Sequence, residues 1–248
     1  MFSRVFDIAN QLLTRHSPFA PLCQVDEWIA YFGREAENIS SVGKEKVNKP
    51  QTFVCRFKQP LQWVIRAGEF DLAKKENSEQ NIRAEKIYVH SSYIPSTNEN
   101  DIALVYLERA AQLNDLVETI CLPDEGELQL ESKCAVAGWG FRPANVHHTS
   151  TPLRSQRVPV VSRQVCNGAN AYGGLVKDNM ICAGYEKGGE DNCYGDGGGP
   201  LMCQNSVGKW FVGGINSWGQ GCGLPGKYSV YTYTERYRDW INRHMQAD

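Results

Sequence analysis

Residues 191–203 read Asp-Asn-Cys-Tyr-Gly-Asp-Gly-Gly-Gly-Pro-Leu-Met-Cys, one glycine-rich loop held between two cysteines. Between Gly195 and Gly199 only Asp196 is not a glycine. Glycine lets the backbone turn sharply and brings its N–H groups close to another group. The pattern therefore predicts a loop of fixed shape that presents backbone hydrogen-bond donors.

This loop resembles the nucleophile loop of the chymotrypsin/trypsin family of serine proteases, whose pattern is Gly-Asp-Ser-Gly-Gly-Pro. Gly197 stands where that pattern has the attacking serine. The family's reaction needs a serine hydroxyl beside a histidine base, with an aspartate that holds the imidazole. Because glycine has no side chain to deprotonate, the sequence predicts a protease fold without protease chemistry.

Further motifs carry the resemblance almost continuously from residue 51 to the C-terminus. They are Asn100-Asp101-Ile102-Ala103-Leu104, Cys134-Ala135-Val136-Ala137-Gly138-Trp139-Gly140, Met180-Ile181-Cys182-Ala183-Gly184 and Ile215-Asn216-Ser217-Trp218-Gly219. The resemblance implies an all-β fold of two six-stranded antiparallel Greek-key barrels. A closing C-terminal helix is also expected, because one helical face would carry Tyr233, Tyr237, Trp240 and Ile241.

The composition is that of a globular domain, since 248 residues of which 42% are hydrophobic can bury a core. A formal net charge of -2 offers no basic surplus for nucleic acid. No apolar run reaches the roughly eighteen residues that a membrane span needs. Nine cysteines without a Cys-x-x-Cys pair favour disulfides over a metal site. We therefore expect a secreted protein, although no signal peptide is recognisable.

Residues 1–50 are expected to form an irregular segment before the inactive protease domain at 51–248. Within this segment the apolar side chains recur at helical spacing at Phe2, Val5, Phe6, Ala9, Leu12 and Leu13. They predict a short amphipathic helix that packs on the body of the protein, with a membrane or partner helix as the alternative. Asn38 begins the only N-glycosylation sequon.

The histidine loop of the family is missing from this chain. Trp63-Val64 is followed directly by Ile65–Asp71, which matches a strand beyond that loop. The five histidines lie elsewhere, at His16, His90, His147, His148 and His244. The first barrel should therefore be incomplete. Asp101 matches the aspartate that orients the catalytic histidine and is expected to keep only a structural role.

The resemblance assigns the rest of the site residue by residue. Four positions match the specificity pocket, namely Asp191, Ser217, Gly219 and Ser229. In trypsin-like members the aspartate recognises a lysine or arginine side chain. Ser229 stands where those enzymes have glycine and should crowd such a side chain, so we expect weak or no arginine recognition. The N–H groups of Gly195 and Gly197 match the oxyanion hole, which does not depend on the missing side chain.

Asp196 matches the carboxylate that pairs, in the family, with the α-amino group created by an activation cut. The sequence has no match to that activation cleavage site, because Ala30-Tyr31-Phe32-Gly33 stands at its position. A buried carboxylate without a partner is destabilising, so Asp196 should be solvated or find another donor. We expect a zymogen-like, partly disordered pocket.

Glu69, Glu76 and Glu79 match the spacing of the calcium loop of trypsin-like members. Carboxylate oxygens of this kind suit calcium. Lys74 and Lys75 lie inside the same loop, and an acidic solvated turn is the alternative interpretation. No other cofactor is expected.

The resemblance also selects the disulfides. It pairs Cys134 with Cys203, Cys166 with Cys182, and Cys193 with Cys222. Cys121 would then bond an upstream cysteine, for which Cys23 is available. This assignment leaves Cys55 as an odd thiol.

These features favour one function over two alternatives. The favoured function is that of a secreted, catalytically dead homologue, similar to the masquerade-type proteins of invertebrates, which carry the same serine-to-glycine change. That resemblance implies a regulator or cofactor of a protease cascade in innate immunity or clotting, whose partners are proteases or their zymogens. One alternative is an active trypsin-like endopeptidase that lost its histidine loop through a skipped exon. The other is a ligand carrier or adhesion module on the same scaffold.

Overall fold

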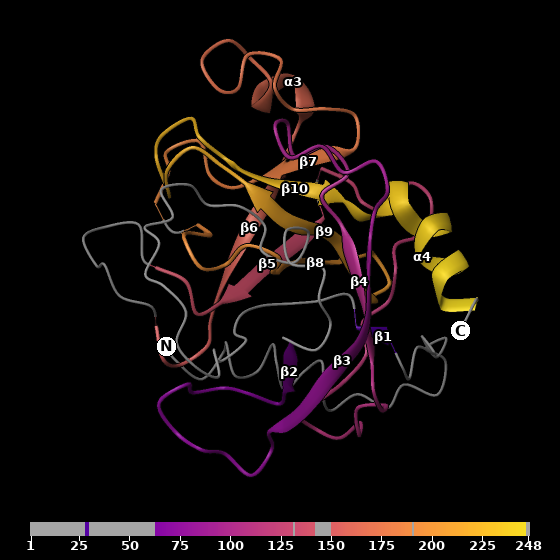
Figure 1. Ribbon diagram of the computed structural model, residues 1–248. Coiled ribbons are helices and arrows are strands. Elements are labelled where there is room, and N and C mark those ends of the chain that lie inside the picture. Colours follow the sequence, from indigo (N-terminus) through magenta and orange to yellow (C-terminus); the bar gives the residue numbers. More distant parts are fainter. Residues whose placement is uncertain (1–27, 30–62, 131, 142–149, 190, 247–248) are drawn as a thin grey trace.

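The computed structural model describes residues 28–29, 63–130, 132–141, 150–189 and 191–246. The first half of the chain forms an open sheet, and the second half forms a closed barrel (Figure 1). The C-terminal helix lies to one side of both.

The open sheet is antiparallel and has the strand order β1-β4-β3-β2. Its strands are β1 Trp28–Ile29, β2 Val64–Ala67, β3 Gln80–Val89 and β4 Ala103–Leu107. In β3, Ile82 and Ala84 are buried between exposed neighbours, as the two-residue repeat of a strand requires. They pack with Ile65 and Val105 in one buried cluster. Within the described residues this sheet does not close. The incomplete first barrel stays a prediction, because residues 30–62 lie outside the described residues.

The closed barrel has six antiparallel strands in the order β10-β7-β6-β5-β8-β9. They are β5 Lys133–Gly138, β6 Arg154–Val161, β7 Met180–Ala183, β8 Pro200–Gln204, β9 Trp210–Trp218 and β10 Ser229–Tyr233. Its core includes Val136, Val158, Leu201, Phe211 and Tyr231, all buried. The predicted all-β fold with a six-stranded barrel is confirmed.

Three short helical elements complete the described chain. They are α3 Arg163–Cys166, the 3-10 turn η2 Thr234–Tyr237 and α4 Arg238–Gln246. Tyr237 and Ile241 are buried against Ile102 and Ile215, so the predicted closing helix is confirmed as core packing. Tyr233 ends strand β10 and does not belong to the helical face. None of the helices in the described ranges is long and apolar enough to cross a membrane.

Three of the predicted disulfides are present, namely Cys134–Cys203, Cys166–Cys182 and Cys193–Cys222. Cys121 is disulfide-bonded as well, to a partner outside the described residues. Its pairing with Cys23 stays a prediction. The helix expected at residues 2–13, the domain boundary at residue 50, the sequon at Asn38 and the thiol of Cys55 also lie outside the described residues.

Candidate functional site

The glycine-rich loop is tied to strand β9 by a pair of backbone hydrogen bonds. Gly198 N–H donates to the Asn216 carbonyl at 2.8 Å, and Asn216 N–H donates to the Gly199 carbonyl at 2.8 Å. Gly195 and Gly198 have φ angles of 105° and 86°, which residues with a side chain rarely adopt. These glycines are therefore required by the turn itself.

Gly197 lies exposed on this loop, in open space. A Cβ placed on it would meet no atom within 4 Å, so a side chain would fit here without rearrangement. Among the hydrogen bonds of the described residues, neither the Gly195 N–H nor the Gly197 N–H is a donor. Both N–H groups are therefore available to an anion, as an oxyanion hole requires, while the attacking hydroxyl is absent.

Asp101 connects the first half of the chain to the barrel. It is 1% exposed. Ser217 Oγ donates to its carboxylate at 2.7 Å, and Thr232 Oγ1 donates to its backbone carbonyl at 2.7 Å. These bonds join the segment before β4 to strands β9 and β10.

The two histidines in the described part of the chain lie at the C-terminal helix. The ring centroids of His90 and His244 lie 5.2 Å and 4.6 Å from that of Trp240. The Nδ1 atom of His90 accepts a hydrogen bond from Ser92 N–H at 3.2 Å. Burial lowers the pKa of His90, and the nearby His244 adds to this effect. Both imidazoles are thus part of the helix packing.

Asp191 and Ser229 form a hydrogen-bonded pair in the predicted specificity pocket. Ser229 Oγ donates to Asp191 Oδ1 at 2.9 Å, and Asn192 N–H donates to the same oxygen at 2.8 Å. Burial raises the pKa of Asp191 from 3.8 to about 6, although these two donors lower it. The Ser229 hydroxyl therefore not only takes up space but already engages the carboxylate.

Asp191→Asn is expected to stabilise the protein near neutral pH. Because the folded pKa is raised, stability falls as the pH rises from about 4 to about 6 and stays low above that. A shift of this size is worth at most about 3 kcal/mol, and we expect a gain of about 2 kcal/mol in the free energy of unfolding. An asparagine oxygen can still accept both hydrogen bonds.

Denaturant unfolding of both proteins at pH 4.5 and pH 7.5, with disulfides intact, measures this gain. The advantage of the asparagine variant should shrink at the lower pH, where the aspartate is protonated. A difference independent of pH would contradict the desolvation of Asp191.

Two buried tyrosines, Tyr172 and Tyr231, complete this region. The ring of Tyr172 lies 4.8 Å from that of Trp218, beside Gly219, where a Cβ would find its nearest atom at 3.6 Å. The hydroxyl of Tyr231 accepts a hydrogen bond from Asn192 Nδ2 at 2.9 Å. The sequence carries little signal for Tyr172, because it lies in an irregular segment without periodicity.

Asp196 is 9% exposed, and two backbone N–H groups of the described residues donate to its carboxylate. Gly140 N–H donates at 2.7 Å and Cys193 N–H donates at 3.0 Å. Gly138 and Gly140 lie so close that a Cβ on them would come within 2.0 Å and 2.3 Å of the carboxylate oxygens. The structure thus gives Asp196 other donors, while the expected disorder of the pocket stays a prediction.

The carboxylates of Glu69, Glu76 and Glu79 face donors that lie nearby in the chain. Glu76 Oε2 accepts from Phe70 N–H at 3.0 Å, and Glu79 Oε1 accepts from Glu76 N–H at 2.6 Å. Glu69 Oε2 lies 3.0 Å from Arg66 Nη1 in an ion pair. No group of three His, Cys, Asp or Glu side chains that could hold a metal ion occurs in the described ranges. Calcium binding at these residues stays a prediction.

The comparisons with known proteins match the part of the chain that holds the open sheet and the barrel. A family model described as Trypsin matches residues 56–241. Trypsin-3 of Salmo salar is 37% identical over 184 residues, which cover 74% of this chain and 74% of that protein. Vitamin K-dependent protein C of Oryctolagus cuniculus is 35% identical over 203 residues, which cover 76% of this chain and 42% of that protein. The match thus spans less than half of that second relative.

Proposed function

The chain belongs to the trypsin family of serine proteases, and from this premise we propose that it is a non-catalytic member that acts by binding other proteins. Gly197 carries the proposal, because the attacking oxygen is missing from a loop whose hydrogen bonds are otherwise in place. The sequence between Trp63 and Asp71 also lacks the family's histidine. An oxyanion hole and binding alone give only about 10³ to 10⁴ over the reaction in water.

A folded scaffold without this chemistry is best explained by a role in binding. The disulfides favour an oxidising, extracellular compartment. The partners would be proteases or their zymogens, and the chain would act as a regulator or cofactor of a protease cascade in innate immunity or clotting. Loops around the inactive cleft, including the exposed Tyr194, would provide the contact surface.

The lack of catalysis is tested on the purified, oxidised chain with a fluorophosphonate probe and an arginine ester. We expect no covalent labelling and a rate at least about 10⁵-fold below that of an active trypsin. An acyl or phosphonyl adduct on any residue would overturn the proposal. It would instead favour an active peptidase.

The binding role is tested by capture from the extracellular fluid of the source organism, followed by mass spectrometry. The immobilised native chain should retain serine proteases or their zymogens, and the reduced, unfolded chain is the matched control. Retention of non-protease ligands alone would favour a carrier or adhesion module.

Ser229→Gly is expected to improve the binding of benzamidine, an arginine-like cation, by about tenfold or more. The variant removes the hydroxyl that donates to Asp191 and so leaves the carboxylate free to pair with the amidinium. Calorimetric titration of both proteins measures the change. Ser229→Ala, which removes the hydroxyl but keeps the Cβ, should fall between them. Equal dissociation constants for all three would show that Ser229 does not limit the pocket.

A further inference from the structure

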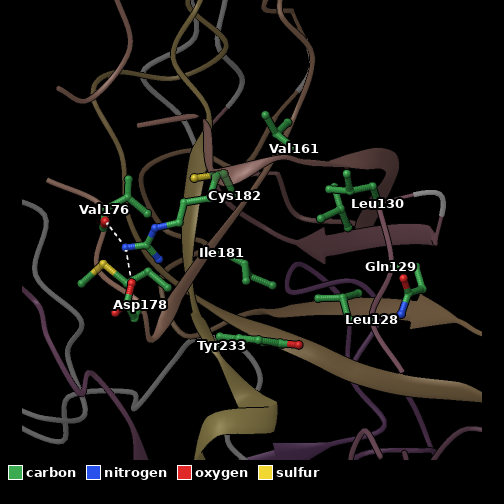
Figure 2. A pocket seen from close by; sticks show the side chains of 12 residues that line it. Leu128, Gln129, Leu130, Val161, Val176, Asp178, Ile181, Cys182 and Tyr233 are labelled. Atoms are coloured by element: carbon green, nitrogen blue, oxygen red, sulfur yellow. Dashed lines mark hydrogen bonds and ion pairs between the residues drawn. The ribbon is translucent and has the colours of Figure 1, made fainter. Parts of the chain in front are cut away.

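The three disulfides whose two ends both lie in the described residues differ in their exposure to solvent. Two of them lie in the core, since Cys134, Cys203, Cys166 and Cys182 are at most 3% exposed. Cys182 lines a barrel pocket of about 280 Å³, but only 1% of this residue is exposed (Figure 2). The pocket therefore does not open its sulfur to solvent, and both bonds are shielded from a reagent in solution.

The third disulfide, Cys193–Cys222, is half-buried at both ends. Its neighbours along the chain are exposed, namely Tyr194 on one side and Gly221 on the other. A thiol that reduces a disulfide must reach one of its sulfurs, and exposed disulfides are the ones that are most readily reduced. Among these three bonds, Cys193–Cys222 is therefore the one open to a thiol in solution.

This disulfide joins the glycine-rich loop to residues 219–226, which follow strand β9 and begin with Gly219 of the predicted specificity pocket. Cys193 is held within the loop, because its N–H donates to Asp196 Oδ2 at 3.0 Å. Among the hydrogen bonds of the described residues, none runs between residues 191–199 and residues 219–226. The disulfide is therefore the link that holds this segment to the loop.

Residues 219–226 have little else that would keep them ordered. Four of these eight residues are glycines, which lose the most conformational freedom on folding, and Leu224 is 49% exposed. The hydrogen bonds that tie the segment to residues 172 and 186–189 are Gln220 N–H to the Tyr172 hydroxyl at 3.2 Å, Gly226 N–H to the Glu186 carbonyl at 2.8 Å, and Gly189 N–H to the Gly223 carbonyl at 2.8 Å. A segment of this kind opens at low cost once its covalent link is removed.

We propose that Cys193–Cys222 is a redox switch, whose reduction by an external dithiol releases residues 219–226 and opens the wall of the predicted specificity pocket. One thiolate of the dithiol attacks a sulfur of the bond and forms a mixed disulfide, which the second thiol resolves. Two electrons and two protons pass from the dithiol to Cys193 and Cys222, which become free thiols, and the dithiol becomes a disulfide. The switch acts on any ligand of the cleft, so it does not depend on the proposed binding of proteases.

Differential alkylation of the full, oxidised chain tests the order of reduction. The native protein is treated with graded concentrations of dithiothreitol, the free thiols are alkylated, and the peptides are mapped by mass spectrometry. Cys193 and Cys222 should be alkylated at least about ten times faster than the cysteines of the two buried disulfides. Earlier reduction of either buried disulfide would overturn the proposal.

Amide hydrogen exchange of the selectively reduced and alkylated chain tests the release of the segment. Exchange at Gln220 and Gly226 should rise at least about tenfold over the oxidised chain. The N–H groups of Gly198 and Asn216, which join the glycine-rich loop to strand β9, should stay protected. The rise is thus expected in residues 219–226 and not in the loop itself.

A double variant with Cys193→Ser and Cys222→Ser controls for the added alkyl groups. It should show the same fast exchange without a reductant and should not respond to dithiothreitol. Unchanged exchange at Gln220 and Gly226 after reduction of the native bond would overturn the proposal. So would a rise that spreads through the barrel strands, because the bond would then hold the whole fold and not this one segment.

Discussion

Gly197→Ser is expected to leave the chain unable to hydrolyse peptide bonds, even though it supplies the missing hydroxyl. A Cβ at this position meets no atom within 4 Å, so the variant should fold like the native chain. The new hydroxyl would still lack a base, since the sequence has no histidine between Trp63 and Asp71. In a catalytic triad, loss of the histidine alone is nearly as severe as loss of all three members, about 10⁶ in kcat.

Steady-state hydrolysis of an arginine ester by Gly197→Ser, Gly197→Ala and an active trypsin measures this prediction. Both variants should remain at least about 10⁵-fold slower than trypsin and should unfold at the same temperature as the native chain. The alanine variant controls for any effect of adding a side chain. A serine variant within about 10³-fold of trypsin would show that another group of this chain acts as the base.

The family motifs allowed the loop, the barrel and three disulfides to be predicted, because they specify backbone positions. The match to the family motif alone assigned Ser229 to the pocket beside Asp191. The structure puts the Ser229 hydroxyl 2.9 Å from Asp191 Oδ1. The raised pKa of Asp191 could not be predicted in this way. It depends on burial, which is set by strands distant in sequence.

Side-chain directions were the part that the sequence could not predict. The spacing of Glu69, Glu76 and Glu79 is compatible with a ligand set, yet their carboxylates face backbone N–H groups and Arg66. Asp196 was expected to need a donor, but spacing alone could not identify Gly140 N–H, which is 56 residues away in the chain. Such pairings depend on tertiary packing, which a linear motif does not describe.

Gly140→Ala is expected to destabilise the protein by about 3 to 5 kcal/mol, because it combines overpacking with loss of a charged hydrogen bond. A Cβ at this position would lie 2.3 Å from Asp196 Oδ2 and 2.4 Å from its Cγ. The carboxylate would have to move and would lose the 2.7 Å hydrogen bond from Gly140 N–H. Since Asp196 is 9% exposed, little water is available to replace that donor.

Denaturant unfolding of Gly140→Ala and of Gly197→Ala, with disulfides intact, separates this effect from a general cost of replacing glycine. The second variant adds the same methyl group to the glycine-rich loop that contains Asp196 but meets no atom within 4 Å, so it should lie within about 0.5 kcal/mol of the native chain. Hydrogen exchange in residues 193–199 should rise only in Gly140→Ala, because displacement of Asp196 loosens the loop that it supports. Equal stability of the two variants would mean that the Asp196 carboxylate can leave its site freely, and the loop would then not depend on its contact with Gly140.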